Sequence, residues 1–288
     1  MPPTEYSSRL THDAFAALGN PIRLEIIHVL WMEGEMRFNE LYAHVDVDDT
    51  GQFSYHLDQL REHFVTTSGQ TYRLTNAGKE IVMTILAHIA GSNPFESPHR
   101  LDATCHSCEA HLHAVSAGGW LRIDCPDCTK LYSSFPIPIA GLTDRSAEEY
   151  LVIYDNRIRR QYALVHRGSC PNCSCEMSRT VVHEAEPEPG LPFVFRHRCA
   201  HCRLEIYSLP GTGLLDDPAV IAFYHQAGID LFARPHWELD WLFDGRSIEL
   251  LDDDPLTYQI DIQVDNHTLT STLDEAGNPR THTIEQTT

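Results

Sequence analysis

Eight of the nine cysteines fall in four C-x-x-C pairs, and this pattern constrains the fold more than any other feature. The first two pairs follow C-x2-C-x16-C-x2-C, and the last two follow C-x2-C-x25-C-x2-C. Each pair suits a tight turn that offers two thiolates, and two such turns complete a tetrahedral Zn²⁺ site with Zn–S bonds of about 2.3 Å. We therefore predict two zinc ribbons and two structural Zn²⁺ ions per chain. The ligands are Cys105, Cys108, Cys125 and Cys128 in the first ribbon, and Cys170, Cys173, Cys199 and Cys202 in the second.

The two ribbons form a diverged internal repeat. Trp120–Asp124 and Phe193–Arg198 each lead into a C-x-x-C pair that is followed by a tyrosine and a proline. The second ribbon needs a longer hairpin excursion through Glu184–Pro192, and exchange of ligand pairs between the repeats is the alternative arrangement. Cys175 belongs to no C-x-x-C pair, and we interpret it as a lone thiol. The alternatives are a spare metal ligand or a redox partner of Cys173.

Charge is the next constraint. The 288 residues include 41 acidic and 21 basic side chains, for a net charge of −20, and only two of the basic residues are lysines. Excess carboxylate with scarce lysine resembles proteins of extreme halophiles, in which molar salt screens self-repulsion. No run of about 18 apolar residues occurs, and the first ten residues lack an apolar signal core. We expect a cytoplasmic chain with no membrane association, in which paired cysteines indicate metal rather than disulfides.

Residues 1–95 have the periodicity of helices. Breaks at Gly19–Pro21 and Asp46–Asp49 separate helices near His12–Leu18, Ile22–Leu30, Asn39–His44 and Gly51–His63. Two short strands around Ser68–Gln70 and a last helix over Ala77–Ile89 follow. This order of elements is the one expected of a winged helix-turn-helix domain.

Two stretches of this region resemble ArsR-like winged-helix transcriptional regulators of the haloarchaeal type: Ala17–Ile27 and Ser54–Leu60. In that family the second stretch lies in the recognition helix, so the resemblance implies double-stranded DNA as a partner. Family members usually pair through their first and last helices, which implies a homodimer. The sensor cysteines of the metal-sensing members have no counterpart in Glu40–Val45.

The residues themselves support a DNA-facing helix. With Phe53, Leu57 and Leu60 turned inward, the opposite face presents hydrogen-bonding groups that suit base edges in the major groove. Solvated surface is the competing interpretation, and His56 has a further alternative, which is packing against the second helix. The predicted DNA-binding residues are Thr50, Gln52, Ser54, Tyr55, His56, Gln59 and, on the hairpin, Arg73. Because residues 1–95 hold 6 basic and 12 acidic side chains, we expect weak non-specific binding and a strict need for a dimer.

The predicted fold class is therefore α+β and multidomain. It comprises a winged helix-turn-helix domain (1–95), a tandem zinc-ribbon module with a connecting helix over 146–165 (96–215), and a small acidic α/β region (216–288). The basic run Arg157, Arg159 and Arg160 is read as a solvated helix face, with a phosphate contact as the alternative. The sequence contains none of the common catalytic or nucleotide-binding motifs, so we do not expect an enzyme.

The function predicted from these features is a sequence-specific, dimeric transcriptional regulator. Its zinc ribbons would dock a protein partner or receive a signal. The alternative is a zinc-ribbon adaptor of transcription or RNA assemblies whose winged helix binds protein.

Overall fold

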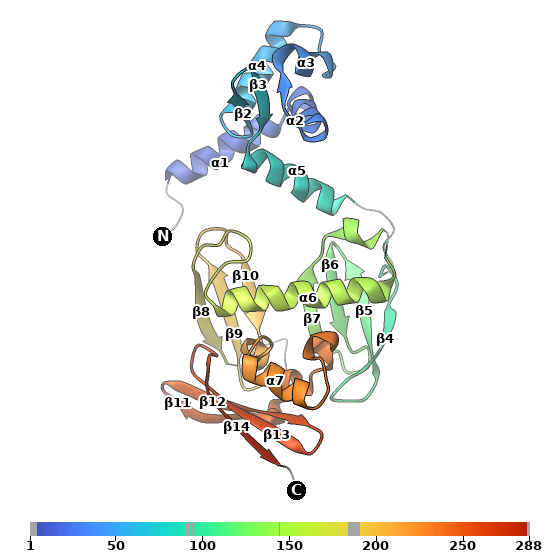
Figure 1. Cartoon of the computed structure of the whole chain (residues 1–288), viewed down its shortest axis with the longest axis vertical. Coiled ribbons are helices and arrows are strands. Elements are labelled where there is room, and N and C mark those ends of the chain that lie inside the picture. Colours follow the sequence, from blue (N-terminus) through green and yellow to red (C-terminus); the bar gives the residue numbers. More distant parts are fainter. Residues whose placement is uncertain (1–4, 90–92, 94, 144, 184–190, 287–288) are drawn as a thin grey trace. The chain divides into compact units, whose positions relative to one another are not determined.

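The computed structural model describes residues 5–89, 93, 95–143, 145–183 and 191–286 (Figure 1). The chain divides into two compact units, an N-terminal unit (Met1–Ala90) and a C-terminal unit (Gly91–Thr288). The structure contains helices as well as several small sheets, so the predicted α+β class is confirmed. No helix in the described ranges is both long and apolar enough to cross a membrane.

The N-terminal unit has five helices and one small sheet among its described residues. The elements are α1 (Glu5–Leu18), α2 (Pro21–Glu33), β1 (Met36–Arg37), α3 (Phe38–Ala43), α4 (Thr50–Arg61), β2 (Val65–Ser68), β3 (Thr71–Leu74) and α5 (Asn76–His88). The predicted helices and the hairpin are all present. The two-residue strand β1, which pairs with β3 at the edge of the antiparallel sheet β1-β3-β2, is too short to leave a periodic pattern in the sequence.

The turn between α1 and α2 shows why the stretch Ala17–Ile27 has its particular residues. The Asn20 side chain caps α2 by accepting from the backbone N–H of Ile22 at 2.9 Å, and Pro21 occupies the first helical turn. The guanidinium of Arg23 donates to the carbonyl oxygens of Ala16 and Ala17, which the end of α1 leaves without helical partners. The motif thus fixes how α1 and α2 join.

The C-terminal unit contains three antiparallel sheets, ordered β4-β5-β6-β7, β10-β9-β8 and β11-β12-β13-β14. The strands are β4 (His99–Thr104), β5 (His111–Ala117), β6 (Trp120–Asp124), β7 (Leu131–Pro136), β8 (Met177–Val182), β9 (Val194–Cys199), β10 (Glu205–Ser208), β11 (Ile248–Asp253), β12 (Leu256–Val264), β13 (His267–Leu273) and β14 (Pro279–Gln286). The helices are α6 (Ala147–His166), α7 (Pro218–Gln226) and α8 (Asp240–Phe243), with 3-10 turns at Ile139–Leu142, Pro210–Leu214, Leu231–Ala233, His236–Glu238 and Gly245–Ser247.

Helix α6 is the central element of this unit. Its predicted capping box is confirmed, because the Ser146 hydroxyl accepts from Glu149 N and the Glu149 carboxylate accepts from Ser146 N. The helix buries one apolar side that includes Tyr150, Tyr154 and Ile158. Figure 1 shows it running across both cysteine-bearing sheets.

The last seventy residues share a core with the ribbons instead of standing apart from them. One hydrophobic cluster extends from Phe95 to Leu273. The ring of Phe243 on α8 lies 4.7 Å from that of Tyr132 on β7, and Trp237 contacts Tyr154 of α6. The expected boundary near residue 215 therefore does not separate two compact units. The large aromatic side chains after that point are buried against the ribbons and α6 rather than within the acidic region alone.

Candidate metal centres and nucleic-acid interface

All four C-x-x-C turns have the same backbone geometry. The N–H of the first cysteine donates to the carbonyl oxygen five residues later at 2.8–2.9 Å, and its own carbonyl accepts from the N–H four residues later at 2.8–3.1 Å. The first set of bonds joins Cys105 to Ala110, Cys125 to Lys130, Cys170 to Cys175, and Cys199 to Leu204. The repeat seen in the sequence therefore extends to the individual turn.

A left-handed residue follows the second cysteine of every turn. Glu109, Thr129, Ser174 and Arg203 have φ between 59° and 66°. Glycine adopts this conformation without steric cost, whereas other residues pay about 1–2 kcal/mol for it. No glycine marks these positions in the sequence, so the sequence did not reveal them.

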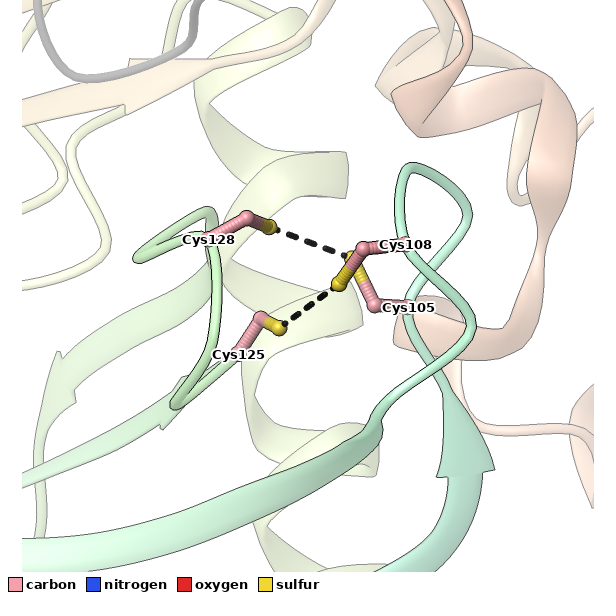
Figure 2. Close-up of side chains that lie close together, drawn as sticks. All are labelled: Cys105, Cys108, Cys125 and Cys128. Carbon is pink, nitrogen blue, oxygen red and sulfur yellow. Dashed lines mark hydrogen bonds between the residues drawn. The ribbon is translucent and has the colours of Figure 1, made fainter.

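The first four thiols converge between two adjacent turns (Figure 2). The Sγ atoms of Cys105 and Cys128 lie 3.5 Å apart, and those of Cys108 and Cys125 lie 3.4 Å apart. All four sulfur atoms lie within 4.8 Å of one another. Disulfide bonds require about 2.05 Å, so these contacts are not disulfides. A tetrahedron with Zn–S bonds of ~2.3 Å has sulfur–sulfur edges of ~3.8 Å, which the cluster fits.

The second cluster repeats this arrangement. Cys170 and Cys202 have their Sγ atoms 3.5 Å apart, as do Cys173 and Cys199, and the four sulfurs again lie within 4.8 Å. The ligand sets are therefore the ones predicted from spacing, with no exchange between repeats. The predicted excursion of Glu184–Pro192 lies mostly outside the described residues, which resume at 191.

In each cluster the surroundings lower the pKa of at least one cysteine, whereas the pKa values of Cys108, Cys128, Cys170 and Cys173 are raised. Burial raises the pKa of Cys105, but hydrogen bonds from the Tyr132 hydroxyl and from backbone N–H groups outweigh it and lower this pKa to about 6. Tyr132 is itself fixed by His106 N, which donates to its oxygen at 2.8 Å. In the second cluster, burial is likewise outweighed by hydrogen bonds from Leu204 N and the Asn172 side chain, which lower the pKa of Cys202 to about 6. Hydrogen bonds to a metal ligand from groups around it fix the orientation of that ligand.

Four thiolates complete a tetrahedron and leave no open position for a substrate or water. Each cluster is therefore able to hold one structural metal ion, and a bound Zn²⁺ would supply a cross-link between two turns. Among the described residues, Cys175 belongs to neither cluster. It lies five residues after Cys170, and its carbonyl accepts from Cys170 N.

The predicted DNA-facing helix is α4. The Asp49 carboxylate caps it by accepting from Gln52 N at 2.6 Å. The predicted inward residues Phe53, Leu57 and Leu60 are buried. Of the predicted contact residues on this helix, Thr50, Gln52, Tyr55 and Gln59 are exposed, and Ser54 is half-buried.

His56 does not lie on that exposed face. Its side chain is buried, with 6% of its surface accessible, and its Nδ1 lies 3.4 Å from Arg23 Nη1 of α2. Burial, and then the charge of Arg23, lower its pKa. The reading of His56 as a DNA contact is thus corrected to the alternative, packing against the second helix. The reason is that position 56 lies next to the buried Leu57 at the edge of the inward side of α4.

Arg73 is exposed on β3, as expected for a hairpin residue, but it is not an isolated cation. Its Nε lies 3.5 Å from the Glu35 carboxylate. The basic run on α6 also differs from the expectation of a solvated face. Arg159 is buried and paired with Asp155 at 2.7 Å, whereas Arg157 and Arg160 are exposed.

Comparison with known proteins gives two matches, both to domains of unknown function. The family described as Domain of unknown function (DUF7347) matches residues 11–85. The family described as Domain of unknown function (DUF7351) matches residues 102–278, a range that includes all eight cluster cysteines. No curated protein and no solved structure matches the chain. The chain belongs to the family described as a domain of unknown function (DUF7351), whose match covers more than half of its length.

Proposed function

We propose that this protein is a sequence-specific DNA-binding transcriptional regulator that acts as a homodimer. The observation that supports it most is the N-terminal unit: a capped α4 with a polar exposed face, preceded by α3 and followed by the β2–β3 hairpin. This is the element order of an ArsR-like winged helix, in which the second helix of the pair enters the major groove.

The side chains on α4 suit direct reading of bases. The amides of Gln52 and Gln59 are able to form paired hydrogen bonds with adenine, and the exposed ring of Tyr55 can contact a thymine methyl group. With 6 basic and 12 acidic side chains in residues 1–95, few phosphates can be neutralised. Specificity would then depend on these base contacts and on two copies binding together.

The dimer is proposed to form through α1 and α5. Both helices carry large apolar side chains that are exposed, and exposed apolar surface of this kind can mark a protein interface. These side chains are Phe15 on α1, Met83, Ile85 and Leu86 on α5, and Ile89 directly after α5, each at least 41% exposed. Burial of these residues against a second copy would stabilise the dimer by about 25 cal/mol per Å² of apolar area.

In the C-terminal unit we propose one structural Zn²⁺ in each cysteine cluster. The bound metal would keep each ribbon folded, so that the ribbons could present a surface that binds a partner protein.

Chromatin immunoprecipitation of the tagged protein in its host tests the regulator. The comparison uses a Gln52→Ala/Tyr55→Ala/Gln59→Ala variant and a control with the exposed Asn39→Ala and Glu62→Ala changes. Discrete peaks that share a two-fold-symmetric motif, retained in the control and lost in the triple variant, are expected. Peaks that persist in the triple variant, or no peaks at all, would favour the alternative function of a zinc-ribbon adaptor. The acidic charge of the N-terminal unit is the observation that supports this alternative.

A further inference from the structure

The C-terminal unit leaves two strand edges open beside one groove. β7 is the last strand of the first cysteine-bearing sheet, and β10 is the last strand of the second. A groove of about 590 Å³ is lined by every residue of β7 and by residues 204–209, which include all of β10. Gln161 and Tyr162 of α6 line it as well.

The lining shows that the groove runs along the edges of these strands and not over their faces. Successive residues of a strand point to opposite faces, so a cavity above one face would be lined by alternate residues only. Here consecutive residues of both strands line the same groove. Backbone groups of two sheets that no other strand of the described residues pairs with therefore face a shared space.

The register identifies which backbone groups are open. Ile137 N donates to Gly119 O. Because residues of an antiparallel strand bond alternately to one side and the other, Phe135 and Ser133 bond to β6. Ser134 lies between them, so its N–H and C=O face the groove. In the second sheet, Cys199 N donates to Leu204 O.

By the same alternation, the backbone N–H and C=O groups of Ile206 and Ser208 bond to β9. Those of Glu205 and Tyr207 face the groove. Both sides of the groove thus offer donors and acceptors at the spacing of a β-strand.

The groove has an apolar lining with one acidic side chain. Leu131, Phe135 and Ile206 are among its aliphatic and aromatic residues, and Glu205 is its one carboxylate. Trp120 and Tyr207 are about half exposed at the groove. Residues 96–288 as a whole carry 29 acidic and 15 basic side chains, so the surroundings favour a ligand that brings positive charge.

We propose that this groove binds an extended segment of a partner protein by strand addition, completing the edges of β7 and β10 together. The segment spans four to six residues, matching the lengths of β10 and β7. It carries apolar side chains and a lysine or arginine that faces Glu205. A helix has no free backbone groups to pair with the edges, and a small molecule would leave most of them unpaired.

This proposal specifies how the zinc ribbons would dock a partner. It rests on the proposed function only in assuming that the protein recruits a partner protein. The probe is a displayed library of random octapeptides, selected on the zinc-loaded full-length protein. We expect enriched sequences with alternating apolar residues and a basic residue. Their affinity should fall at least tenfold on Ser134→Pro, which removes an open-edge N–H but no bond to β6. Hydrogen exchange at the Ser134 and Tyr207 amides should slow when such a peptide binds.

A charge swap separates groove binding from general attraction to an acidic protein. Glu205→Lys should shift the selected sequences from basic to acidic residues, whereas Glu249→Lys, an exposed change on β11, should leave them unchanged. Zinc content and the circular dichroism spectrum establish that each variant is folded.

Peptides that bind wild type and Ser134→Pro equally, or a library that yields none, would overturn the proposal. Saturable binding of the neutral dye N-phenyl-1-naphthylamine to both proteins, without selected peptides, would show a small-molecule pocket instead. The Gln52→Ala/Tyr55→Ala/Gln59→Ala variant should retain peptide binding. Failure of the DNA-binding proposal and failure of this one are therefore measured separately.

Discussion

A buried ion pair on α6 determines how firmly the last seventy residues are held to the ribbons. Arg159 Nε donates to the Asp155 carboxylate at 2.7 Å, and the side chains are only 6% and 4% exposed. The same carboxylate accepts from the backbone N–H of His236 at 2.8 Å, and His236 Nδ1 lies 2.6 Å from it. Arg159 also donates to the carbonyl of Arg234. Asp155 thus joins the central helix to the segment before α8.

Asp155→Asn keeps the shape of the side chain but removes its charge, which leaves the buried Arg159 cation unneutralised. Loss of one partner from a buried pair costs about 3–5 kcal/mol of unfolding free energy. For a unit of this size each kcal/mol lowers Tm by about 2–4 °C, so Tm should fall by roughly 6–20 °C. The matched control is Asp216→Asn. Its partner Arg167 directly follows the same helix, and the pair also has a short N–O distance of 2.6 Å. The side chains of Asp216 and Arg167 are 36% and 69% exposed, so a loss of less than about 1 kcal/mol is expected.

Differential scanning calorimetry with zinc at fixed concentration measures both variants. Arg159→Gln in the Asp155→Asn background removes the stranded charge, so the double variant should be more stable than Asp155→Asn alone by at least about 1 kcal/mol. Strictly additive losses, or equal losses for Asp155→Asn and Asp216→Asn, would refute the reasoning.

The pH dependence gives a second check on the same pair. Burial raises the pKa of Asp155, but the hydrogen bond and charge of His236 and the charge of Arg159 outweigh it and hold the pKa below its usual value. A carboxyl group whose pKa is lower in the folded state contributes its full stabilisation of the fold above its unfolded pKa of about 3.9. That contribution is lost as pH falls through the folded pKa. The ionisation of Asp155 itself should therefore add no pH dependence to the penalty of Asp155→Asn from pH 5 to 8, and this penalty should shrink only as pH falls below about 4.

Three further outcomes are expected. Metal analysis should find two zinc ions per chain, one in Cys105→Ser and still two in Cys175→Ser; two in Cys105→Ser would contradict the first cluster. Thr129→Gly relieves a left-handed residue with φ of 62° and should raise the unfolding free energy by about 0.5–1 kcal/mol in urea titrations, and a loss would show that this strain is absent. His166 has its pKa lowered to about 3 by burial and by the charges of His197 and Arg179. Stability should thus fall by up to about 1.4 kcal/mol per pH unit below pH 6.5, with a shallower fall for His166→Gln.

The sequence predicted the metal ligands correctly because the chemistry is local. A C-x-x-C pair can close its turn by itself, and the spacing between pairs limits which turns meet. The inward face of α4 was also predictable, since apolar residues that recur every three or four positions lie on one side of a helix. The position of His56 was not. Whether position 56 faces solvent depends on Arg23, thirty-three residues earlier, which reaches α4 from α2.

The predicted acidic α/β region at residues 216–288 shares its core with the ribbons, and its sequence does not show this. Its net charge of −12 distinguishes it from the ribbons in the sequence, but charge describes the surface and not the core. Trp237, Phe243 and Tyr258 are all buried. Their ring partners include Tyr154 on α6, Tyr132 on β7 and Phe195 on β9, which lie more than sixty residues earlier in the chain. Periodicity cannot reveal such partners, because it reports which side of an element is buried and not against what.

The open groove follows from the repeat itself. In each ribbon the second cysteine turn leads directly into the strand that ends its sheet, β7 in the first and β10 in the second. Among the described residues, no strand pairs with the outer edge of either one, and proteins normally cover such an edge because it promotes aggregation. The two repeats thus contain two such edges, and both line the groove together with Gln161 and Tyr162 of α6. Edges that face a shared groove are shielded from indiscriminate pairing yet remain open to one extended segment. The internal repeat that is visible as paired cysteines thus accounts for both the metal clusters and the proposed binding groove.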